Sequence, residues 1–317
     1  MNAALAGAGT LLAIVIFAML LPAGADAAGQ LCTDSWTGPA EGNWQTAADW
    51  SNGQLPTSLD VACIPAGDTV TVTGASQAGV LEGEGALVLA GGLLETASAL
   101  EASSIASLAL RGGTLSLAGE LEVGSALTGG GGSTTVSGAG ELVVGSGATG
   151  TIGERCARLV LDEATLVNQG TLTSGGAGGA PDGAIWMENG AQLQNAGTFA
   201  DDSTEPGGCG FGRVPSVFDN GGSSAPSIVN TGTFQSDDTE EPVTIGVPLE
   251  NQGTVGPLAG TLQLAGGGGE GASGGAFAAA SGTALEFTGG AFALSGAKWS
   301  GPGTIAVAGA SVTAASL

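Results

Sequence analysis

The chain has 317 residues, of which 43% are apolar and 61 are glycine, and its 29 acidic and five basic side chains give a formal net charge of −24. This apolar content excludes a typical disordered chain, and glycine without a Gly-x-y period excludes collagen. The lack of a basic footprint excludes nucleic acid as a partner. The absence of a phosphate-loop motif argues against a small-molecule cofactor.

The segment 1–27 is typical of a signal peptide. Leu11–Leu21 is an apolar run of suitable length, and Ala25-Asp26-Ala27 supplies an A-x-A cleavage site. We therefore expect cleavage near Ala27 and a mature protein that is secreted or exposed on the cell surface. The segment before the run lacks Lys and Arg, so an uncleaved anchor is the alternative, although the run is short for a membrane span.

Residues 28–67 form a segment rich in Trp and Cys, unlike the rest of the chain. It contains Trp36, Trp44 and Trp50, three of the five tryptophans. Repeat proteins must cover the ends of their cores, so we expect these indoles to cap the first coil of a repeat structure. Stacking of the indoles on sugars is the alternative.

The four cysteines, Cys32, Cys63, Cys156 and Cys209, all follow the predicted signal peptide. No C-x-x-C occurs, and no histidine is present to complete a zinc site. Export favours disulfides. Of the three possible connectivities we favour Cys32–Cys63 and Cys156–Cys209, because each pair lies within one segment of distinct composition.

Residues 36–64 read WTGPAEGNWQTAADWSNGQLPTSLDVACI. This segment resembles the opening of large bacterial extracellular proteins with right-handed β-helix repeats, of the autotransporter-associated and adhesin-like type. The matching residues are Trp36, Gly38, Gly42, Trp44, Ala47, Trp50, Ser51, Gly53, Pro56, Asp60 and Ile64. Asp49 and Ala62 depart from the pattern, and Cys63 is an addition. The resemblance implies an exposed or secreted β-helix and carries no catalytic residue across.

Residues 68–317 consist of short apolar alternations punctuated by glycine, of the kind that predicts strands. The segment 119–125 recurs at 140–146, which sets a period of about 21 residues. A second motif, apolar-x-Asn-x-Gly-Thr-apolar, occurs four times, with its asparagines at Asn168, Asn195, Asn230 and Asn251. The shortest step between them equals the same period, and the two longer steps carry inserts. Repeats at such a period are typical of solenoids.

We predict an all-β fold, a right-handed parallel β-helix with about 21 residues and three short strands per coil. Asn and Gly tolerate left-handed backbone, which favours a corner at each Asn-x-Gly. Asparagines at equivalent corners are expected to stack in a ladder. Leu121 and Leu142 should occupy equivalent inward positions, as should Val123 and Val144. A β-sandwich is the competing fold, but it does not need motifs at a fixed offset.

Two sets of charged residues are candidate sites. Oxygen-rich turns can bind calcium, and Asp201, Asp202, Asp237 and Asp238 lie on such turns. A solvated loop is the alternative. If Cys156 and Cys209 pair, three arginines gather near them, either as a site for an anion or uronic acid or as local charge compensation. These arginines are Arg155, Arg158 and Arg213.

The sequence favours a protein without catalytic activity, because no histidine is available for nucleophilic catalysis. We expect a structural or adhesive role with an extracellular ligand or surface glycan as partner. The alternative is a β-helix that binds polysaccharide, or cleaves it as lyases do.

Overall fold

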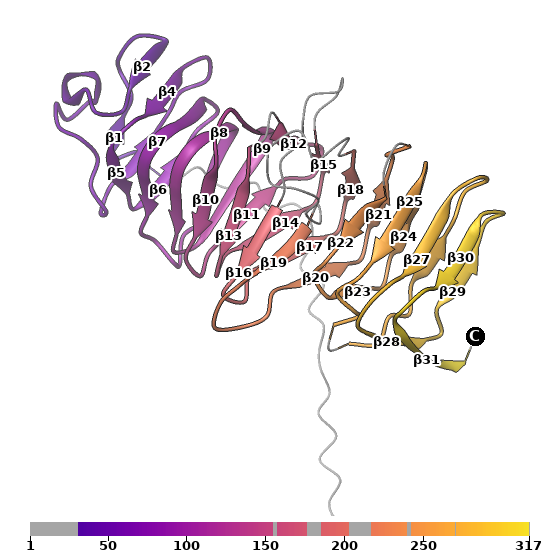
Figure 1. Cartoon of the computed structure of the whole chain (residues 1–317). Helices are drawn as coiled ribbons and strands as arrows, with labels where there is room; N and C mark the ends of the chain where they lie inside the picture. Colours follow the sequence, from indigo (N-terminus) through magenta and orange to yellow (C-terminus); the bar gives the residue numbers. More distant parts are fainter. Residues whose placement is uncertain are drawn as a thin grey trace, which may run out of the picture. The chain divides into compact units, whose positions relative to one another are not determined.

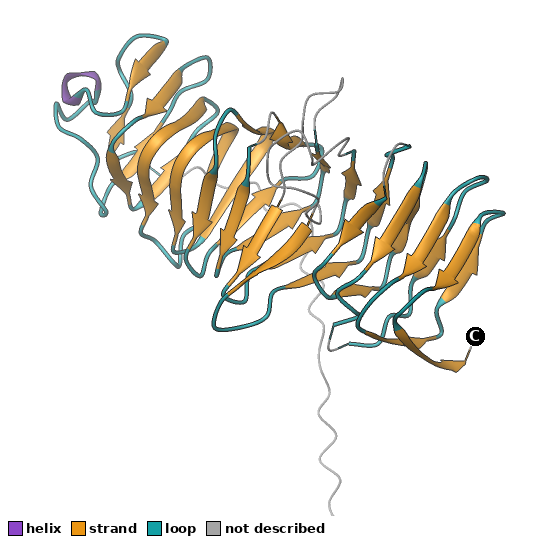
Figure 2. Ribbon diagram, in the orientation of Figure 1, coloured by secondary structure: helices purple, strands orange, loops and turns teal. Residues whose placement is uncertain are grey.

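The computed structural model describes residues 31–154, 157–175, 185–202, 217–239, 242–269 and 271–316. The predicted signal peptide, residues 1–27, lies outside these ranges. Leu31–Leu317 forms one compact unit. Within the described residues, strands make up almost all regular structure, and a single 3-10 turn, η1 (Ala47–Asp49), is the helical element (Figure 2).

The strands pair in parallel in three columns, which we call the first, second and third faces (Figure 1). The long strands β7, β8 and β9 bend and contribute to more than one face. The first face contains β2 (Glu41–Asn43), β4 (Thr69–Val72), β7 (Ala86–Thr96), β8 (Ser103–Leu117), β9 (Glu120–Gly130), β12 (Thr149–Glu154), β15 (Thr171–Ser174), β18 (Thr198–Asp201), β21 (Thr233–Ser236), β24 (Thr254–Pro257), β26 (Ala276–Ala278) and β29 (Lys298–Ser300).

The second face also includes parts of β7 and β8. Its other strands are β5 (Ala75–Ala78), β10 (Thr134–Ser137), β13 (Leu159–Asp162), β16 (Ile185–Glu188), β19 (Val217–Gly221), β22 (Val243–Ile245), β25 (Thr261–Leu264), β27 (Ala284–Phe287) and β30 (Thr304–Val307).

The third face comprises three paired groups. The first is β1 (Asp34–Ser35), β3 (Val61–Cys63) and β6 (Val80–Glu82); the second joins β8 and β9 to β11 (Glu141–Val144), β14 (Thr165–Asn168), β17 (Gln192–Asn195), β20 (Ser227–Asn230) and β23 (Leu249–Asn251); the third is β28 (Ala291–Ser295) with β31 (Ser311–Ser316).

The predicted repeat is confirmed by the register of the third face. Leu121 pairs with Leu142 and Val123 with Val144, and all four side chains are buried. Each inward residue therefore stacks on its counterpart one coil away. The prediction of an all-β, parallel β-solenoid with coils of about 21 residues is confirmed. The parallel ladders exclude the competing β-sandwich, whose sheets are antiparallel.

The core is a stack of aliphatic side chains, with phenylalanine rings after two of the Asn-x-Gly-Thr motifs. Strands alternate buried and half-exposed residues, as in β14, where Leu166 and Asn168 face inward. Phe199 and Phe234, from neighbouring coils, stack with ring centroids 4.7 Å apart. The Trp-rich segment belongs to the same stack, because β2 pairs with β4 of the following coil.

The glycines of the Asn-x-Gly corners are required for a different reason from the one predicted. Gly197 and Gly232 lie outside the left-handed region that the sequence argument invoked. A Cβ on Gly232 would instead overlap the carbonyl oxygen of Gly197, one coil away. Likewise, a Cβ on Gly253 would overlap the oxygen of Gly232. Stacked corners therefore approach so closely that only glycine fits.

The predicted asparagine ladder is present and buried. The Nδ2 of Asn168 donates to the Oδ1 of Asn195 at 2.7 Å, Asn195 donates to Asn230 at 2.7 Å, and Asn230 donates to Asn251 at 2.8 Å. Each Nδ2 also donates to a backbone oxygen of the next coil; that of Asn168, for example, reaches Thr198 O at 2.9 Å. The ladder thus ties four coils together through their interior.

Candidate functional site

The three N-terminal tryptophans form a buried cluster. Trp36, Trp44 and Trp50 are at most 2% exposed. Trp50 lies edge-on to both partners, with centroid distances of 5.3 Å to Trp36 and 4.7 Å to Trp44. Its Nε1 donates to the backbone oxygen of Trp44 at 2.9 Å. The prediction of a Trp-rich cap is confirmed, and the buried indole faces are not available to stack on sugars.

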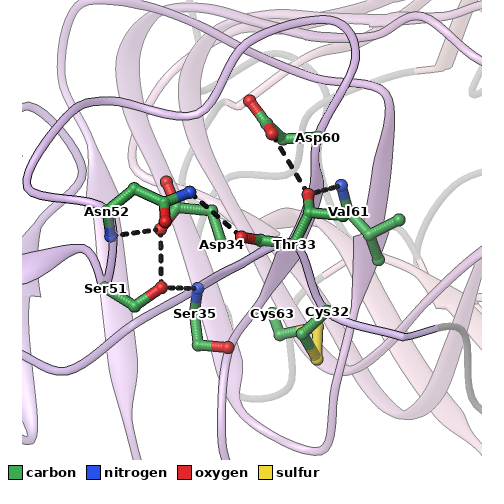
Figure 3. The surroundings of a disulfide bond; sticks show 9 residues. All are labelled: Cys32, Thr33, Asp34, Ser35, Ser51, Asn52, Asp60, Val61 and Cys63. Atoms are coloured by element: carbon green, nitrogen blue, oxygen red, sulfur yellow. Dashed lines mark hydrogen bonds between the residues drawn. A yellow bond between two sulfur atoms is a disulfide. The ribbon is translucent and has the colours of Figure 1, made fainter.

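A disulfide fastens the start of the stack. Cys32 and Cys63 are bonded, with their Cα atoms 5.7 Å apart, as the sequence predicted (Figure 3). Beside it, the buried Asp34 carboxylate accepts hydrogen bonds from Ser51 Oγ at 2.9 Å and from the Asn52 N–H at 3.1 Å. The predicted Cys156–Cys209 pair lies outside the described residues.

Asp60 fixes the loop that follows the tryptophans. Its carboxylate accepts from the Thr57 hydroxyl at 2.6 Å and from the Thr57 N–H at 2.9 Å. These hydrogen bonds lower the pKa of Asp60, the side-chain bond having the largest effect. Thr33 Oγ1 also donates to Asp60, at 3.1 Å, and so connects the loop to the residue beside Cys32 (Figure 3). These contacts are structural in character.

The four candidate calcium ligands lie at one corner of two neighbouring coils. Asp201 and Asp238 are buried, whereas Asp237 is exposed. Burial raises the pKa of Asp202, and the charges of Asp237 and Asp238 raise it further. The fold therefore brings at least these three carboxylates into mutual electrostatic range.

Within the described ranges, no group of three or more Asp, Glu, Cys or His side chains is placed to hold a metal ion. Calcium binding at Asp201, Asp202, Asp237 and Asp238 stays a prediction. A melting temperature that rises with added calcium in the wild type, but not after all four are changed to Asn, is its test.

Of the three candidate anion-binding arginines, Arg158 is described, and Arg155 and Arg213 lie outside the described residues. The Arg158 guanidinium lies over the ring of Trp186, 4.1 Å from its centroid, in a cation–π contact. Arg158 directly precedes β13, and β13 pairs one coil apart with β16, the strand that contains Trp186. Sequence reasoning gave Trp186 no role, although aligning the two strands as repeats would have placed it beside Val160 and near Arg158.

A groove of about 520 Å³ crosses the second and third paired groups of the third face. Pro226, Ile228, Val229, Pro248 and Glu250 line it, together with the glycine run 266–269. It forms where this glycine run takes the place of a regular strand between β23 and β28. Among the described lining residues, Glu250 is the one carboxylate, and none of them is basic.

Stacked parallel coils, a buried asparagine ladder and a disulfide-fastened Trp cap define a β-solenoid protein. No family model, curated protein or solved structure matches the chain. In the described part of the chain, no helix has the length and apolar character to cross a membrane.

Proposed function

We propose that this protein is a rigid structural or adhesive element, exported to the cell exterior, without catalytic activity. The observation that carries the proposal is the asparagine ladder. Four coils are joined by buried amide hydrogen bonds in one continuous interior column. Such a fully connected interior network stiffens a scaffold.

Two further features support an extracellular location. Disulfides such as Cys32–Cys63 form and persist in oxidising compartments, which supports export. The N-terminal apolar run and the A-x-A site are typical of a signal peptide, which also supports export. The opening segment also resembles bacterial adhesin-like β-helix proteins, and the solenoid agrees with the fold that this resemblance implies.

The test has two parts. In cells that produce the chain, protease added from outside and fractionation should find it at the surface or in the medium, with Cys32 and Cys63 oxidised. Recovery from the cytoplasm with free thiols would contradict export.

Beads coated with the purified chain should adhere to cell surfaces or immobilised glycans better than beads coated with an unrelated acidic protein. It should release no product from pectin or alginate, with or without calcium. Measurable turnover of either polymer would favour the rival enzyme instead.

A further inference from the structure

A second hollow, of about 340 Å³, lies beside the Trp cap and is a candidate ligand site. We call it the cap pocket. It is bounded by the segment Leu55–Thr57 on one side and by the outward residues of β5 and β7 on the other. Its volume falls at the lower end of the range for small-molecule pockets, about 300–1,000 Å³. A ligand of one or two sugar rings is the appropriate size.

One wall of the cap pocket is apolar and open to solvent. Leu93 is 36% exposed and pairs in register with Ala75, whose small side chain leaves space above the strand. Leu55 and Pro56 contribute further apolar surface from the facing segment. The apolar face of a pyranose ring packs against aliphatic side chains of this kind, because it removes their area from water.

Two polar residues lie on the same strands, two positions further along from Ala75 and Leu93. Gln77 and Glu95 are exposed, pair in register on adjacent coils, and both line the cap pocket. Together an amide and a carboxylate offer donors and acceptors to neighbouring hydroxyl groups. Glu95, in a chain of net charge −24, disfavours an anionic ligand.

Trp44 also lines the cap pocket, and its indole N–H is buried without a hydrogen-bond partner. An unpaired buried donor is costly, and native structures rarely keep one without a reason. An oxygen atom of a bound ligand would satisfy it. The other two cap tryptophans have paired indole N–H groups: that of Trp36 donates to the backbone oxygen of Pro39, and that of Trp50 to the backbone oxygen of Trp44. The indole N–H of Trp44 is thus the unpaired one of the three.

We propose that the cap pocket binds the neutral sugar end of an extracellular glycan. The apolar wall takes one ring face, Gln77 and Glu95 bind hydroxyl groups, and the Trp44 N–H donates to a ligand oxygen. The choice of a glycan rests on the proposed function at the cell exterior; the pocket geometry does not depend on it. The pocket would give the adhesive role a defined contact point.

The test is an array of neutral and acidic oligosaccharides probed with the purified mature chain and three variants. Leu93→Asp places a charge in the apolar wall, and Trp44→Phe keeps a ring but removes the N–H. Leu258→Asp alters a similarly exposed leucine, 53% exposed, outside the cap pocket and serves as the matched control. Circular dichroism and melting curves establish that each variant is folded.

We expect neutral oligosaccharides to bind and Leu93→Asp to abolish detectable binding. Trp44→Phe should weaken affinity by about three- to tenfold, the loss of one hydrogen bond, and Leu258→Asp should bind like the wild type. Should Trp44→Phe fold poorly, Leu93→Asp on the surface still decides the matter.

If all three variants still bind glycans, the cap pocket is not the glycan site, although an adhesive function would remain in place. A preference for uronic acids would overturn the neutral ligand. No binding to any oligosaccharide would overturn the proposal, and the bead and localisation assays would then judge the proposed function separately.

Discussion

The position of an asparagine within the ladder should decide how much its loss destabilises the protein. At the upper end, the Oδ1 of Asn168 is buried without a hydrogen-bond partner, because the preceding coil carries Val144 in register with it. Replacing Asn168 by valine extends this apolar column by one coil. The unpaired acceptor then moves to Asn195, and the number of unpaired amide oxygens stays the same.

Replacing Asn195 by valine interrupts the ladder instead. Asn168 keeps its unpaired oxygen, and the Oδ1 of Asn230 loses its donor and becomes a second one. Both variants lose one bond to a backbone oxygen and create a similar void, so these terms cancel in the comparison. The difference is one extra lost hydrogen bond and one extra unpaired buried acceptor, about 1–3 kcal/mol.

The free energy of unfolding of the mature chain and its variants, measured by urea titration with circular dichroism, tests this difference. Asn195→Val and Asn230→Val should each be less stable than Asn168→Val and Asn251→Val by about 1–3 kcal/mol. Asn251→Val is the lower-end control, because it leaves no further oxygen unpaired. Equal losses for all four variants would refute the ladder as a connected hydrogen-bonded unit.

Three other predictions concern the corners, the cap and the response to pH. Gly232→Ala should cost about 1–3 kcal/mol of unfolding free energy in the same titration, because the new methyl meets a stacked carbonyl; Gly124→Ala, where the nearest atom is 3.9 Å away, should be neutral or slightly stabilising. Reducing the Cys32–Cys63 disulfide, which spans 31 positions, should lower stability by about 3–4 kcal/mol, seen as a lower urea midpoint, and an unchanged midpoint would contradict its role in the cap. Burial raises the pKa of Glu120 above its ordinary value of 4.5, and the charges of two neighbouring glutamates raise it further. The stability that protonated Glu120 contributes is therefore complete below pH 4.5 and is lost as the pH rises above that value. Glu120→Gln should therefore raise the melting temperature at pH 7 and leave it unchanged at pH 4, and equal shifts at both would refute the assignment.

The sequence alone determined the fold class, the length of the coil and the nature of its interior. Leu121 and Leu142 stack because alternation with period two sets the inward side of each strand and the repeat offset sets the coil. The asparagine ladder followed in the same way from four copies of one motif. The buried Trp cap and the Cys32–Cys63 bond were equally predictable from the sequence, since both lie in one short segment whose composition differs from the rest.

Only the tertiary structure decided which side chains meet outside the repeated motifs. The hollow between Leu55 and Leu93 and the carbonyl oxygen that excludes a side chain at Gly232 were not predicted from the sequence. The unpaired N–H of Trp44 likewise depends on how the cap folds over the first coils. Trp44 and Leu55 lie in the Trp-rich segment, which has no copy of the repeated motifs, so the repeat period does not predict what they touch. Local alternation fixes which way a side chain points, whereas stacking of the coils fixes what it touches.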